Sequence, residues 1–195
     1  MAFSKHFTPD NEPTVSEDPI LEQVDELVPN FAEFMKRYSG VSFNNGLYRV
    51  HAVNAIRLFT ALCVEAFPAF EGRIVCFSSD WLGRQFSIDL AGRDKKLVHL
   101  MDSGANESFE IPHEFREFHN DELVQDKEAA LAESFYKKWL DQGGRPPDLS
   151  ECVGYRVPLF LNGEDDTGNL EVIDMEVYWS INAQLIAQIE GRSEQ

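Results

Sequence analysis

Apolar and polar residues alternate along four short segments in the middle of the chain, at residues 73–78, 84–90, 97–101 and 108–111. A period of two places successive side chains on opposite faces of a pleated strand, so each segment is predicted to be a β-strand. A turn at residues 80–83 joins the first two segments, and residues 102–106 form the loop of a hairpin between the last two. We therefore expect four neighbouring strands of one mostly antiparallel sheet.

Segments with a helical period lie on both sides of this predicted sheet. Apolar residues recur on one helix face over residues 31–38, and Asp126 can cap a second strong helix over residues 127–142. Phe135 and Trp139 lie on the apolar face of that second helix, so both are expected in the core. Helices flanking a run of strands indicate the α+β class, with a central sheet flanked by helices.

A single domain is predicted for residues 16–192, because no internal repeat or low-complexity linker interrupts the pattern. Fifteen Phe residues, spread from Phe3 to Phe160, also favour one distributed core. Residues 1–15 are polar and contain two prolines, so we expect a flexible leader there.

The last forty residues combine strand, turn and helix signals. Alternation over residues 155–162 predicts a strand near a sheet edge, where Pro158 is tolerated. The Asn162-Gly163 pair favours a turn, and a short β-branched strand is predicted at residues 169–173. Between the turn and that strand stand three successive carboxylates: Glu164, Asp165 and Asp166.

A final helix is predicted to follow Asp174, which is a suitable N-cap residue. Four apolar residues recur at a spacing of four along it and are expected to form its buried face: Val177, Ile181, Leu185 and Ile189.

The block from Gly154 to Leu185, GYRVPLFLNGEDDTGNLEVIDMEVYWSINAQL, resembles the C-terminal region of bacterial immunity proteins of the SUKH-like group. Residues 27–48, LVPNFAEFMKRYSGVSFNNGLY, resemble the first helix and strand of such domains, and residues 70–88 resemble their central sheet. The group includes the cognate inhibitors of type VI secretion DNase toxins. The resemblance covers most of residues 20–190 and implies a SUKH-like α+β fold and a toxin as the partner.

The net charge of −17 narrows the choice of partners. Direct binding to DNA, RNA or an anionic membrane usually needs Lys and Arg, so we expect neither nucleic acid nor membrane as a ligand. An acidic surface suits a basic protein such as a nuclease, although acidity can also serve colloidal stability alone. The N-terminus lacks the apolar core of a signal peptide, which favours the cytoplasm.

No motif predicts catalysis, and we expect no enzyme activity, cofactor or metal. The five histidines form no close metal-binding pair, and there is no glycine-rich phosphate loop. Ser78-Ser79-Asp80 lacks the glycines of a nucleophile elbow. Three cysteines without a C-x-x-C spacing are expected to stay reduced, with Cys152 partly exposed.

The leading hypothesis is a cytoplasmic immunity protein, an antitoxin that inhibits a cognate toxin through a protein–protein interaction. Two turns are its candidate partner-binding segments. The first contains Asp80 and Trp81, where an exposed Trp could be an interface hot spot; the second contains Glu164, Asp165 and Asp166. The simpler interpretations are that the acidic turn is only solvated and that Trp81 is buried. A regulatory scaffold of the same fold, without a toxin partner, is the main alternative, and an enzyme of unknown chemistry is the third.

Overall fold

A six-stranded antiparallel sheet organises the computed structural model, which describes residues 2–93 and 95–193. Each strand pairs with the next one along the chain, in the order β1-β2-β3-β4-β5-β6. The strands are β1 (Ser42–Phe43), β2 (Tyr48–Val50), β3 (Ile74–Asp80), β4 (Gln85–Asp89), β5 (Leu97–Asp102) and β6 (Glu107–Glu114). The four segments with alternating residues are thus neighbours in one sheet, as predicted. A separate antiparallel hairpin pairs β7 (Glu151–Tyr155) with β8 (Leu170–Asp174).

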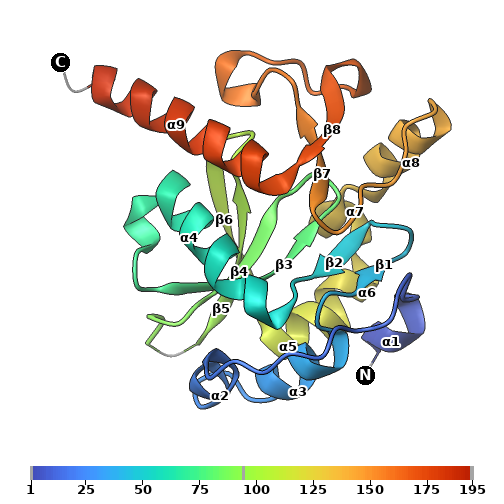
Figure 1. Cartoon of the computed structure of the whole chain (residues 1–195), viewed down its shortest axis with the longest axis vertical. Coiled ribbons are helices and arrows are strands. Elements are labelled where there is room, and N and C mark those ends of the chain that lie inside the picture. Colours follow the sequence, from blue (N-terminus) through green and yellow to red (C-terminus); the bar gives the residue numbers. More distant parts are fainter. Residues whose placement is uncertain (1, 94, 194–195) are drawn as a thin grey trace.

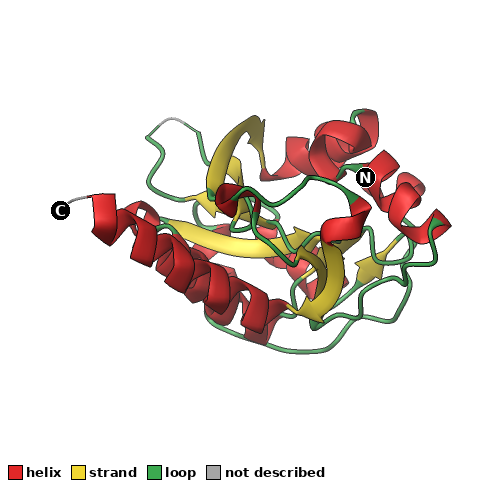
Figure 2. Cartoon of the chain, turned by 90° about the horizontal axis from the view of Figure 1, so that it is seen from above, coloured by secondary structure: helices red, strands yellow, loops and turns green. Residues whose placement is uncertain are grey.

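Helices cover both faces of the sheet, which confirms the α+β class. They are α1 (Phe3–His6), α2 (Ile20–Asp25), α3 (Phe31–Tyr38), α4 (Ile56–Ala66), α5 (Phe115–Glu117), α6 (Leu123–Gln125), α7 (Lys127–Leu131), α8 (Glu133–Asp141) and α9 (Met175–Ser193). Helices α4 and α9 pack together in front of the sheet in Figure 1. Figure 2 shows the strands between this layer and a second group of helices.

The period-two pattern of β3 separates two hydrophobic cores, one on each face of the sheet. Val75 and Phe77 point into the larger core, which also takes side chains from α1, α2, α3 and α5. Ile74 and Cys76 point into the smaller core, beneath α4 and α9. Because the same strands contribute to both cores, the chain folds as one unit.

Residues 3–9 pack onto the larger core and the sheet edge, so the prediction of a flexible leader over residues 1–15 was wrong for this part; residue 1 lies outside the described residues. Phe3 and Phe7 are almost completely buried, and their rings stack with centroids 4.5 Å apart. Pro9 then forms a β-bridge with Phe43 at the sheet edge. Two aromatic side chains bury enough apolar surface to hold a short segment that looks polar on average.

The helix expected over residues 127–142 is divided into α7 and α8 by Ala132, which has a positive φ of 49°. Asp126 caps α7 by accepting a hydrogen bond from the backbone N–H of Ala129, as predicted. Helix α8 still meets the larger core with its predicted face, and Phe135, Trp139 and Leu140 pack against that core. Tyr136 is buried there, whereas Phe135 and Trp139, both expected in the core, are only half-buried.

Helix α9 starts after Asp174, whose side chain accepts a hydrogen bond of 3.0 Å from the backbone N–H of Val177 and confirms the predicted cap. The prediction of its buried face was wrong. Val177 is 48% exposed and Ile181 47% exposed, while the residues that enter the core include Tyr178 and Trp179. Apolar residues occur on both sides of α9, and the larger aromatic rings gain more from burial. No described helix has the length and apolar character needed to cross a bilayer.

Candidate partner-binding site

Strands β7 and β8 carry a long connection that contains the three predicted carboxylates. The two strands are in register from Glu151 opposite Asp174 to Tyr155 opposite Leu170. Beyond Tyr155 the chain leaves the ladder, so the strand expected over residues 155–162 was wrong; Pro158 has no N–H with which to extend it. Residues 156–169, here named the acidic loop, instead form two 3₁₀ turns (Figure 1).

The Asn162-Gly163 pair turns the chain for two different reasons. Asn162 has a φ of 65°, in the left-handed region that Asn tolerates. Gly163 is required by a close approach, because a Cβ atom there would lie 1.9 Å from the carbonyl oxygen of Val157. The predicted turn is therefore present, with the glycine acting through its missing side chain.

Asn169 holds the two ends of the acidic loop together. Its side-chain amide donates to the carbonyl oxygens of Val157 and Glu164, at 2.8 and 2.9 Å. Its side-chain oxygen accepts from the N–H of Val157 at 3.0 Å. Its backbone oxygen accepts from Arg156 at 2.8 Å. Four hydrogen bonds from one residue give the loop a defined shape without a regular ladder.

All three carboxylates of the acidic loop are exposed, and each has a different role within the loop. Asp166 accepts hydrogen bonds from the backbone N–H groups of Gly168 and Asn169, so it caps the second 3₁₀ turn. Asp165 accepts a hydrogen bond of 2.6 Å from the hydroxyl of the largely buried Tyr155. Among the described residues, no cation pairs with Glu164. The negative charge is thus presented to solvent from a fixed backbone.

Arg49 anchors the hairpin to the main sheet from a buried position on β2. Its guanidinium donates to the backbone oxygens of Asp148 and Glu151 on the approach to β7, and to that of Asp80 on β3. The backbone N–H of Val153 donates to the carbonyl of Trp81, at 2.8 Å. These bonds join the element that carries the acidic loop to the centre of the fold.

The other predicted partner-binding segment lies inside the protein, so Asp80 and Trp81 cannot contact a partner directly. Both side chains are 0% exposed. The indole N–H of Trp81 donates to the carbonyl of Leu131 at 2.9 Å, and its ring packs against Tyr136 with centroids 4.8 Å apart. The β7–β8 hairpin and α7 cover the turn at residues 80–83, for which the sequence alone predicts only a connection between two strands.

Asp80 forms a buried ion pair with Arg84, with a shortest N···O distance of 2.6 Å. Burial raises the pKa of the Asp80 carboxyl, although Arg84 favours the ionised form. Burial likewise raises the pKa of Asp102, which accepts from the N–H groups of Gly104 and Ala105. The charged groups of Asp80, Arg84 and Asp102 therefore interact with one another or with the backbone inside the fold.

Cys152, expected to be partly exposed, is completely buried, and burial raises the pKa of its thiol to about 12. A thiol with such a pKa stays protonated near neutral pH and is a poor nucleophile. Among residues 2–93 and 95–193, no group of three or more His, Cys, Asp or Glu is placed to hold a metal ion.

Exposed apolar residues within the acidic loop were not identified from the sequence as site residues. Val157 is 47% exposed and Leu161 38% exposed, on the same loop as the three carboxylates. Both residues belong to the alternating pattern that predicted a strand over residues 155–162, so that pattern did not identify them as exposed site residues. Protein interfaces combine an apolar centre with a polar rim, and this loop exposes both kinds of side chain.

Comparison with known proteins identifies the fold and nothing further. No model of a known protein family matches the chain, and no curated protein is similar to it. The crystal structure of Atu4351 from Agrobacterium tumefaciens is similar, with a TM-score of 0.67 and 14% sequence identity. The similarity covers 92% of this chain and 86% of that one, so the two proteins share the architecture over nearly their whole length.

Proposed function

We propose that this chain is an immunity protein that binds a cognate bacterial toxin in the cytoplasm and neutralises it. The observation that carries the proposal is the exposed acidic loop, held in a defined shape on a hairpin that is anchored to the sheet. The net charge of −17 and the resemblance to SUKH-like immunity proteins support it. The resemblance suggests a type VI secretion effector as the toxin.

A nuclease is the kind of toxin that fits this charge best. Its substrate groove binds phosphates through Lys and Arg, so a loop with Glu164, Asp165 and Asp166 is complementary to it. Inhibition would follow from occlusion of the groove or of the active site. Long-range attraction would steer the encounter, and apolar residues such as Val157 and Leu161 would slow dissociation.

The test uses the toxin domain encoded by a gene next to that of this chain. Association and dissociation rates are measured between 50 mM and 500 mM salt for the wild type and for E164Q/D165N/D166N. These replacements keep a hydrogen-bond acceptor at each position while removing three charges. We expect association to slow by roughly three- to tenfold at low salt, with a smaller change in dissociation.

A matched control removes three exposed carboxylates at the opposite end of the molecule in Figure 1, by E17Q/E26Q/E33Q on and around α2 and α3. The control should slow association less than the loop variant, because it removes the same number of negative charges but far from the loop. Equal association rates for the two variants would show that the acidic loop is not part of the contact surface. A wild type that neither binds the toxin nor blocks its DNA cleavage would favour the scaffold alternative.

A further inference from the structure

The outer side of α9 carries apolar residues that the fold does not cover. Val177 and Ile181, 48% and 47% exposed, lie one turn apart, and Leu185 continues the row as a half-buried residue. We name Val177, Ile181 and Leu185 the outer row. On the inner side Trp179 and other side chains already fill the smaller core. A helix that is apolar on both sides is normally covered on both sides.

The outer row also lies in a stretch without charge. Residues 177–189 contain no Asp, Glu, Lys or Arg, although 26% of the whole chain is charged. The exposed polar residues beside the row are Gln184 and Gln188. The centre of a protein interface is depleted of charged residues, because burying them costs desolvation energy. A solvated helix face in so acidic a chain would be expected to carry carboxylates.

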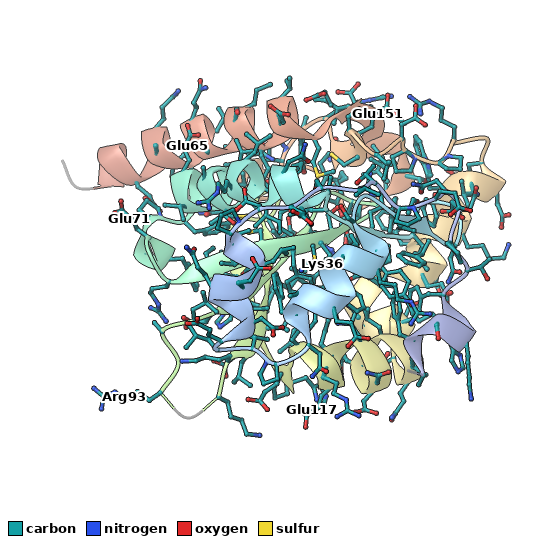
Figure 3. The ribbon with its side chains drawn as sticks, turned by 60° about the horizontal axis from the view of Figure 1, so that its bottom comes forward. Lys36, Glu65, Glu71, Arg93, Glu117 and Glu151 are labelled. Carbon is teal, nitrogen blue, oxygen red and sulfur yellow. The ribbon has the colours of Figure 1, made fainter. Side chains whose placement is uncertain are left out.

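Most of the charged residues around the outer row are acidic. Glu176 and Glu190 lie on α9 at either end of the uncharged stretch, and both are exposed. Glu65 lies on α4, the helix that packs against α9 (Figure 3). The basic residues of α4 and α9 are Arg57, which pairs with Asp18, and Arg192 near the C-terminal end of α9.

We propose that the outer row of α9 docks an amphipathic segment of a basic protein, in which an apolar row is flanked by Lys and Arg. The apolar rows would pack together, and the flanking cations would face Glu65, Glu176 and Glu190. The inference rests on the proposed function only in identifying the basic protein as the toxin.

A second copy of this chain fits the same surface poorly. Antiparallel pairing of two α9 helices would bring Glu176 of one copy towards Glu190 of the other, and parallel pairing would bring each towards itself. Arg192 offsets part of the repulsion at Glu190, but either arrangement brings together two chains with a net charge of −17 each. An anionic membrane would be repelled for the same reason.

The experiment compares two pairs of substitutions on exposed apolar residues. V177Q/I181Q changes the outer row, and L27Q/F109Q changes two positions elsewhere, each 49% exposed. Gln removes the apolar contact without adding charge and is well tolerated in a helix. Circular dichroism and thermal unfolding first establish that both variants are folded.

With the neighbouring toxin domain as probe, V177Q/I181Q should dissociate at least about tenfold faster than the wild type, and L27Q/F109Q should match the wild type. If the wild type binds and both variants dissociate equally, the docking inference is overturned while the proposed function stands. Self-association of the wild type that V177Q/I181Q abolishes, measured by sedimentation, would also overturn the inference in favour of a second copy.

A synthetic peptide tests the surface separately from the toxin. The probe is an 18-residue helix with Leu on one face and Lys on the other, compared with a scrambled peptide of the same composition. The wild type should prefer the patterned peptide, and V177Q/I181Q should lose that preference. If the toxin does not bind, this preference still supports a basic amphipathic partner. Equal binding of the patterned and the scrambled peptide would exclude such a partner.

Discussion

The two turns predicted from the sequence to bind a partner occupy opposite environments. The turn at residues 80–83 is sealed inside the fold, with Asp80 paired to Arg84 and Trp81 fully buried. The turn at residues 164–166 is exposed, and its carboxylates accept hydrogen bonds from backbone N–H groups and from the Tyr155 hydroxyl, or face solvent. A carboxylate paired with a cation inside the fold stabilises the interior, while an exposed one without a cation partner remains available to another molecule. The same chemical substitution should therefore have very different effects in the two turns.

The largest expected loss of stability comes from Trp81→Ala. Deleting a buried aromatic side chain costs about 3–5 kcal/mol, and this change also leaves the carbonyl of Leu131 without its indole donor. Denaturant unfolding measures the loss. Phe109→Ala, at a site 49% exposed, serves as the control and should change the free energy of unfolding by less than about 1 kcal/mol. A similar small value for Trp81→Ala would mean that the turn is not sealed.

Asp80→Asn should cost nearly as much, about 3 kcal/mol, because it leaves the buried Arg84 guanidinium without its counter-charge. Removing both charges in D80N/R84Q should restore part of the loss, since neither member of the pair is then left with an unmatched charge. A double-mutant cycle on urea unfolding gives the coupling between the two residues. If the effects of D80N and R84Q on the free energy of unfolding are additive, the two residues have no coupling energy.

Local pattern was sufficient to predict the four central strands, but it predicted a false strand over residues 155–162 and did not show which surfaces stay exposed. The alternation at residues 73–78 and 97–101 depends on near neighbours only, and the sheet follows from it. Burial of Trp81, by contrast, depends on Leu131, fifty residues away in the chain. The outer row of α9 illustrates the same point, because a spacing of four residues marks an apolar face without saying whether anything covers it.

Acidification should destabilise the folded protein through two buried histidines, His51 and His119. Burial lowers the pKa of His51 and of His119 to about 3, from an ordinary value of 6.5. The unfolded chain binds protons at these residues below pH 6.5 and the folded chain does not, so stability falls as pH drops through 6.5. Each histidine should cost about 2 kcal/mol by pH 5. Urea unfolding between pH 7.5 and 5 measures the slope.

Substitution of the two histidines separates their effect from that of the buried carboxylates. The raised pKa values of Asp80 and Asp102 act in the opposite direction, since those groups favour the folded state as pH falls. H51Q/H119Q should flatten the slope between pH 6.5 and 5, whatever its effect on stability at pH 7.5. An unchanged slope in that variant would assign the pH dependence to other groups.

The smallest effect on stability should come from the exposed turn. In E164Q/D165N/D166N, Asn at position 166 can still cap the 3₁₀ turn, and Asn at position 165 can still accept from Tyr155. No buried cation loses a partner, so the free energy of unfolding should change by less than about 1 kcal/mol. D80N, with a single Asp→Asn change, should cost more than all three surface changes together. If the loop variant were the less stable of the two, its carboxylates would be structural, and slower binding to a toxin could no longer be read as lost steering.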